Sequence, residues 1–169
     1  MSLEVRGVLW SQLGGAIDML ENAIRACPPT LWGDRTREPE YWYIVYHTLF
    51  FLDYTLADSH EGFMPPEPYN LDELDPAGVL PARVYSQEEM LIYLEHCRHK
   101  CRLTLRALTP ERAAAPSGSV RPGWTQLELR LSDLRHVQHH TAQLNLLLRQ
   151  SVDSAPRWVS RAGTELAAV

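Results

Sequence analysis

The chain has 169 residues, of which 45% are hydrophobic, and we expect one domain, residues 1–169, with a core of its own. Its 16 Lys and Arg against 21 Asp and Glu give a net charge of −5, and no basic run could follow a phosphate backbone, so we expect no nucleic-acid partner. The N-terminus lacks a basic start followed by a long apolar run, and the three cysteines lack disulfide-framework spacing. We therefore expect a cytoplasmic protein with no membrane partner.

The first two helices are predicted from proline positions and apolar spacing. Four long segments free of proline carry apolar residues at helical period, and the first covers residues 2–26. The second is expected to begin at Pro39, since a missing N–H costs nothing in a first helical turn, and to reach about residue 58. At about 100° per residue, His47 falls in the middle of the inward face of this helix.

Capping boxes mark the start of the third and fourth helices. Ser86 with Glu89 opens the third, and Thr125 with Glu128 opens the fourth, which is expected to continue to about residue 150. In each pair the two side chains reciprocally satisfy backbone donors that the helix itself leaves free. The pattern predicts an all-α four-helix bundle.

Two connections stand out for their length. Residues 59–85, between the second and third helices, contain five prolines and are long enough to run the length of a helix, so we expect a crossover that leaves these two helices parallel. Residues 151–169 are expected to form a C-terminal tail that anchors through the aromatic ring of Trp158.

Three histidines lie where the bundle should hold apolar side chains. His136 and His140 are four residues apart, so both project from one face of the fourth helix, while His47 projects inward from the second. A buried imidazole needs a partner, and one ion bound to all three would satisfy them together. We therefore predict a divalent-metal site, with zinc or nickel as the preferred ion.

The alternative is that each histidine is a hydrogen-bonded core residue. The available partners are Tyr43, Tyr54, Thr141 and Gln143. The coincidence of three inward histidines on two helices favours the shared ion. His139 belongs to a polar stripe and is expected outside the site, and Asp133 or Asp58 could orient a ring nitrogen, although we expect Asp133 to be solvated and Asp58 to lie near a helix end.

The cysteines and the other histidines of the third helix and the crossover are predicted to be core or surface residues without a bound metal. Cys97 and Cys101 fall in the apolar stripe of the third helix and are expected in the core. Beside them, His96, His99 and Lys100 are expected on the solvated face of that helix. His60, in the crossover, is expected to be a solvated loop residue, with a lid over the site as the alternative.

The two histidine segments resemble the DinB/YfiT-like superfamily of helical-bundle metalloenzymes. The resemblance rests on the stretch from His47 to Tyr54 and on Arg135-His-Val-Gln-His-His-Thr-Ala-Gln-Leu144, and it covers essentially the whole chain. It implies that His47, His136 and His140 bind a divalent ion. Members of that superfamily with assigned roles include thiol-dependent S-transferases and a thiol-dependent maleylpyruvate isomerase, and others are described as metal-dependent hydrolases.

Two functions follow as expectations. In the first, the three-histidine site activates a low-molecular-weight thiol, as a possible co-substrate, or water for S-transfer to, or hydrolysis of, a small-molecule substrate. In the second, the chain is a non-catalytic metal-binding or structural bundle that acts through oligomerisation. A homodimer is expected from the resemblance and from an exposed Leu146.

Overall fold

The structure is a computed structural model that describes residues 3–57, 59–118 and 121–166. Its regular elements are helical. The four long helices are α1 (Leu3–Ala26), α3 (Tyr41–Thr55), α4 (Gln87–Arg106) and α6 (Gln126–Val152); the shorter ones are α2 (Pro29–Trp32), α5 (Pro110–Ala114) and the 3-10 helix η1 (Asp72–Leu74). The all-α prediction is confirmed. None of the described helices combines the length and apolarity needed to cross a bilayer.

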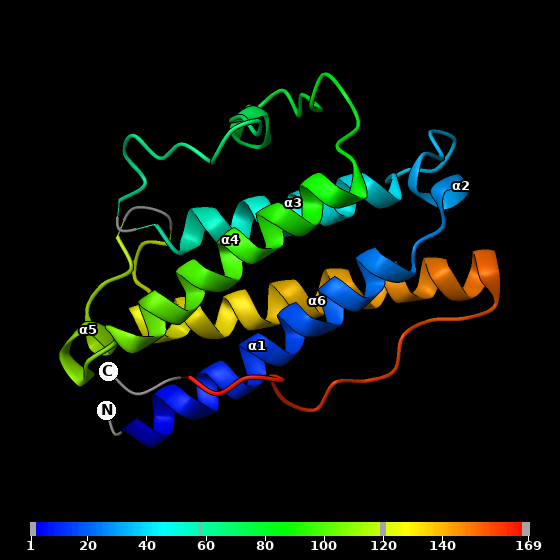
Figure 1. The fold of residues 1–169 in the computed structure, drawn as a ribbon. Coiled ribbons are helices and arrows are strands. Elements are labelled where there is room, and N and C mark those ends of the chain that lie inside the picture. The colour runs from blue at the N-terminus through cyan, green and yellow to red at the C-terminus, as the bar shows by residue number, and fades with distance from the viewer. Residues whose placement is uncertain (1–2, 58, 119–120, 167–169) are drawn as a thin grey trace.

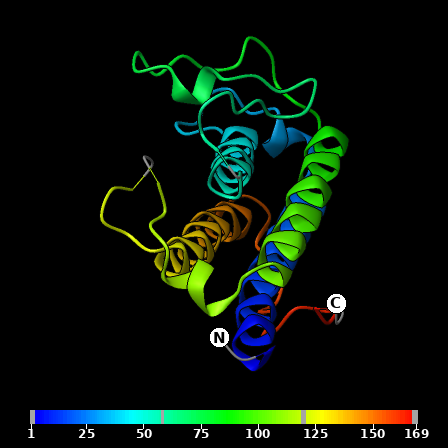
Figure 2. The same ribbon diagram turned by 90° about the vertical axis from the view of Figure 1, so that its left-hand side faces the viewer.

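The four long helices pack side by side (Figure 1). The principal contacts join α1 to α6 and α4, and α3 to the same two helices. Figure 1 shows α3 and α4 running in one direction and α1 and α6 in the other, and the segment between α3 and α4 returns along the length of the bundle. This is the crossover arrangement that the long connection indicated, and in the end-on view the crossover lies over α3 (Figure 2).

The helix starts agree with the sequence in two places and differ in one. Both capping boxes are present, with Ser86 and Thr125 as N-caps. The second long helix begins at Tyr41 instead of Pro39, because Glu40 still has extended backbone angles (φ −68°, ψ 146°), and it ends at Thr55. The prediction that this helix starts at Pro39 and reaches residue 58 was therefore wrong at both ends.

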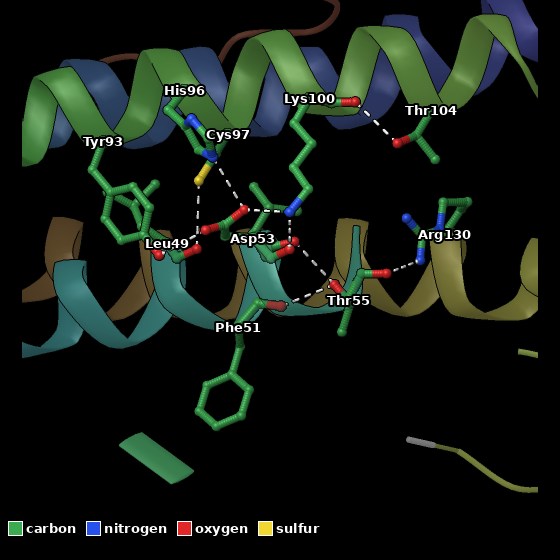
Figure 3. A network of polar contacts seen from close by, with 11 residues as sticks. Leu49, Phe51, Asp53, Thr55, Tyr93, His96, Cys97, Lys100, Thr104 and Arg130 are labelled. Carbon is green, nitrogen blue, oxygen red and sulfur yellow. Dashed lines mark hydrogen bonds and ion pairs between the residues drawn. The ribbon is translucent and has the colours of Figure 1, made fainter. Parts of the chain in front are cut away.

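Polar side chains join α3 to α4 around a buried carboxylate (Figure 3). Asp53 is 1% exposed and accepts hydrogen bonds from the Tyr93 hydroxyl (3.1 Å), His96 Nε2 (3.2 Å) and Lys100 Nζ (2.6 Å). His96 and His99 are exposed, as predicted, whereas Lys100 is half-buried, and both His96 and Lys100 also bond to Asp53. A buried carboxylate needs a counter-charge, and the long stem of Lys100 lets its ammonium reach back from the helix edge. Cys97 is buried in the core, as predicted.

The C-terminal tail packs along α1, but not through the residue expected. The Trp158 side chain is 67% exposed, so the prediction of a ring anchor was wrong. Hydrogen bonds from α1 to main-chain groups of the tail hold it instead. Ala162 N donates to Ser11 O (2.7 Å), and the Trp10 side chain donates through Nε1 to Thr164 O (2.7 Å). A hydrogen bond to the main chain needs no aromatic residue in the tail itself, which is why the sequence did not reveal it.

Candidate metal centre

The structure brings the three predicted histidines together between α3 and α6. The ring centroids of His47 and His136 are 5.4 Å apart, those of His47 and His140 are 4.9 Å apart, and those of His136 and His140 are 4.6 Å apart. One nitrogen of each imidazole lies within 4.8 Å of the other two. Across residues 3–57, 59–118 and 121–166, this is the group of three or more His, Cys, Asp or Glu side chains that could hold a metal ion.

The donor set and spacing fit a divalent ion. Zinc–imidazole bonds are about 2.0–2.1 Å long, so two nitrogens on one ion are at most about 4.2 Å apart. The nitrogens of the three histidines, within 4.8 Å of one another, are close to that limit. All three ligands are partly buried, so a bound ion would be shielded on the side of the bundle. Three imidazoles leave further coordination positions for a reacting molecule.

A carboxylate from the crossover fixes the orientation of His47. Nδ1–H of His47 donates to Glu73 Oε2 at 2.7 Å, and the Glu73 side chain is 2% exposed. With Nδ1 protonated, the lone pair of His47 is on Nε2, which is the nitrogen left for an ion. Carboxylate acceptors of this kind commonly orient metal-binding histidines. Sequence reasoning missed Glu73 and looked to Asp133 and Asp58 for this role; Asp58 lies outside the described residues.

His140 has a similar arrangement within α6. Its Nδ1–H donates to Gln143 Oε1 at 2.7 Å, so its lone pair is also on Nε2. Gln143 was one of the partners considered for a histidine without metal. The observed bond uses only one nitrogen of the ring, however, and it leaves the other available, as the bond to Glu73 does for His47.

Burial keeps the α6 histidines neutral. Removal from water, and then the neighbouring His140 and His47, lower the pKa of His136 to about 3. Burial also lowers the pKa of His140, against the opposing effect of its hydrogen bond to Gln143. Since only the neutral imidazole offers a lone pair, both residues have the protonation state that a metal requires at pH 7.

Asp133 lines a cavity together with the three histidines and is buried, so the expectation that it is solvated was wrong. Asp133 is 4% exposed and its Oδ2 lies 3.3 Å from Nε of Arg130, which is 1% exposed. Arg130 Nη2 also donates to Thr55 O at 2.6 Å, which ties α6 to α3. Burial raises the pKa of Asp133 to about 6, although Arg130 opposes the rise. Asp133 is not one of the three grouped ligands and is held by Arg130.

Two other histidines, His139 and His60, do not belong to the group. His139 is exposed, as predicted, although its ring centroid is 5.0 Å from that of His140. His60 is half-buried, with its ring 4.6 Å from that of Tyr54. Neither belongs to the set that could hold an ion.

Comparisons of the chain with protein-family models, with curated proteins and with solved structures return no match in any of the three. The chemistry of the site is therefore argued from the geometry of its own residues: three imidazoles, two of them oriented by hydrogen bonds at Nδ1, lie together beside a cavity.

Proposed function

We propose that this chain is a divalent-metal-dependent enzyme of the DinB/YfiT-like type. His47, His136 and His140 hold the ion, for which zinc and nickel are the expected identities because three imidazoles suit both. The substrate is a small molecule, and the reaction is S-transfer from a low-molecular-weight thiol or hydrolysis by water. The observation that carries the proposal is the convergence of three imidazole nitrogens within 4.8 Å of one another.

The residues around the group support a reactive centre over a purely structural one. A bound divalent ion lowers the pKa of a water or thiol that it coordinates and polarises a substrate oxygen. Glu73 holds the His47 ring in one tautomer, and the Phe51 ring, with its centroid 4.8 Å from that of His47, supplies an apolar neighbour. Structural zinc sites are closed by four protein ligands, whereas three leave room for chemistry.

Elemental analysis of the untagged protein tests the site. We expect about one zinc or nickel ion per chain, and we expect His136→Ala to lose it. His139→Ala is the matched control, since it removes an exposed histidine from the same helix and should keep the ion. A wild-type protein without stoichiometric metal, or equal metal content in both variants, would show that the histidines are hydrogen-bonded core residues.

A second assay separates catalysis from metal binding alone. The metal-loaded protein is incubated with an electrophile such as 1-chloro-2,4-dinitrobenzene and each of several cellular thiols, and separately with activated esters in water. Turnover that disappears in His136→Ala supports the enzyme. Stoichiometric metal without turnover of either kind would instead favour a metal-binding bundle that acts through oligomerisation, for which gel filtration of the loaded protein gives the assembly state.

A further inference from the structure

A pocket of about 800 Å³ lies between α6, α1 and the C-terminal tail. Trp124, just before α6, and Trp158, in the tail, form two of its walls, and we call it the tryptophan pocket. Ala16, Leu134 and Ala142 add further apolar surface. Pockets that bind small organic molecules have volumes of about 300–1,000 Å³, so this one is large enough for a substrate.

The tryptophan pocket adjoins the three histidines. Ser132 and His136, one turn apart on α6, line both this pocket and a second cavity of about 270 Å³. His47 and His140 line that second cavity as well. A molecule in the tryptophan pocket can therefore place one end beside an ion held by the histidines.

The two tryptophans leave much of their surface uncovered. Trp124 is 37% exposed and Trp158 is 67% exposed, although tryptophan is highly buried on average. The main chain at both places is nevertheless fixed. Trp124 N donates to Arg121 O at 3.1 Å, and Gln12 Nε2 donates to Ser160 O at 3.3 Å, where the tail returns along α1 (Figure 1). Aromatic surface that is held in place and uncovered is suited to stacking against a planar ring.

Arg135 gives the tryptophan pocket a positive charge. Among the residues that the structure describes, none forms a hydrogen bond or an ion pair with the Arg135 guanidinium, and those that line the pocket include no Asp or Glu. Glu128, two turns earlier on the same side of α6, is bound to the backbone and hydroxyl of Thr125 in the capping box. The charge of Arg135 is therefore available to a ligand, and a guanidinium can donate two parallel hydrogen bonds to a carboxylate.

We propose that the tryptophan pocket binds the substrate and that this substrate is a small aromatic carboxylate. Its ring stacks on Trp124 and Trp158, and its carboxylate pairs with Arg135. This inference rests on the proposed function, since the ion beside His136 would act on the part of the molecule that extends out of the pocket. Contacts at both ends fix the orientation of the substrate, which is how positioning contributes to rate.

Ligand-observed NMR on the metal-free protein tests the pocket without any reaction. The probes are 2-naphthoate, its neutral carboxamide, which keeps the ring without the charge, and acetate, which keeps the charge without the ring. The variants are Arg135→Gln and Trp158→Ala. Arg149→Gln is the matched control for the first, since Arg149 is an exposed arginine of α6 outside the pocket. Ile92→Ala is the control for the second, since Ile92 is 64% exposed on α4.

We expect Arg135→Gln to weaken binding of 2-naphthoate by about tenfold and to leave binding of the carboxamide unchanged. Trp158→Ala should weaken both aromatic probes by about threefold or more, and acetate should bind more weakly than 2-naphthoate. Both controls should match wild type. Unchanged 2-naphthoate affinity in either variant, an equal loss for the carboxamide in Arg135→Gln, or no binding of 2-naphthoate to wild type would overturn this inference alone.

Cobalt-loaded protein tests whether the pocket serves the metal site. Co²⁺ is paramagnetic and speeds the relaxation of nearby protons, so 2-naphthoate should relax faster with cobalt-loaded than with zinc-loaded protein. Equal relaxation in the two would separate the pocket from the ion and overturn the inference, while the proposed function would stand. Failure of the wild-type protein to take up either metal would overturn the proposed function, and the inference with it.

Discussion

Glu73 accepts a hydrogen bond from Nδ1 of His47 at 2.7 Å across 26 residues of chain. The acceptor is in the 3-10 helix η1 of the crossover, and the donor is in the middle of α3. The long connection therefore does more than return the chain to the start of α4. It places a buried carboxylate behind a candidate metal ligand and leaves Nε2 of that ring as the nitrogen available to an ion.

Removing this carboxylate should weaken metal binding without abolishing it. We expect Glu73→Leu to lower zinc affinity by about 10- to 100-fold, because the His47 ring loses its orientation and its basicity. Glu73→Gln should lose less, since an amide oxygen can still accept from Nδ1. Competition with a chromophoric chelator measures the affinity. Asp75→Asn, at an exposed acid of the same crossover, should match wild type; a loss as large as that of Glu73→Leu would point to a general effect of charge.

The metal-free protein should lose stability in mild acid because of His136. Its pKa is about 3 in the folded state and about 6.5 when unfolded, so between these values the unfolded chain binds more protons. The contribution of His136 to the free energy of unfolding therefore falls as the pH drops below about 6.5, by up to about 1.4 kcal/mol per pH unit for one proton, while the raised pKa of Asp133, about 6, acts in the opposite direction below pH 6. Urea unfolding at pH 7.0, 6.0 and 5.0 measures this slope.

In His136→Gln the free energy of unfolding should depend less steeply on pH over the same range. His139→Gln should keep the wild-type slope, since His139 is exposed. If wild type and His136→Gln show the same slope, burial of His136 is not the source of the acid sensitivity.

The Arg130 and Asp133 pair should respond asymmetrically to loss of either partner. Asp133→Leu leaves a guanidinium that cannot release its proton, and we expect a loss of about 3–5 kcal/mol in the free energy of unfolding. Arg130→Met should cost less, because the buried carboxyl, whose pKa is already raised to about 6, can take up a proton. Denaturant unfolding at pH 7 compares the two.

The double variant Arg130→Met with Asp133→Leu should recover most of the loss, since no buried charge remains. Additive losses in the double variant would mean that the two side chains do not interact. All three proteins should still bind zinc, because neither residue belongs to the ligand group.

Contact between the tail and α1 depends on a glycine. A Cβ on Gly15 would lie 3.1 Å from the carbonyl carbon of Arg161 and 3.3 Å from Ala162 N, so a larger side chain must displace the tail. We expect Gly15→Val to increase amide hydrogen exchange at Ala162 and Gly163, whose N–H groups bond to α1. Gly7→Val is the control, since a Cβ there meets nothing within 4 Å. Unchanged exchange in Gly15→Val would mean that the tail adjusts without detaching.

The sequence was sufficient for the helices and for the three histidines because both depend on local rules. Apolar period locates the long helices, capping residues locate two of their starts, and four-residue spacing places His136 and His140 on one face. Whether an ion binds there, and which reaction follows, stay predictions from this geometry.

Glu73 could not be identified in the same way. The crossover has no period and contains several acids, and which of them reaches His47 depends on the path of the whole segment. The burial of Asp133 did have a signal: at about 100° per residue, Asp133 falls on the same side of α6 as Leu129, Val137 and Leu144. That angular position indicates an inward residue, and Arg130 on the same side supplies its counter-charge.

The three histidines come from two rigid helices, while Glu73 and Arg121 come from the two connections that flank them. Loops accept insertions and exchanges far more readily than packed helices do. A lineage of such proteins can thus retain the three histidines and replace the connections beside them, so that the walls of the adjoining cavity change while the proposed ligand group is inherited intact.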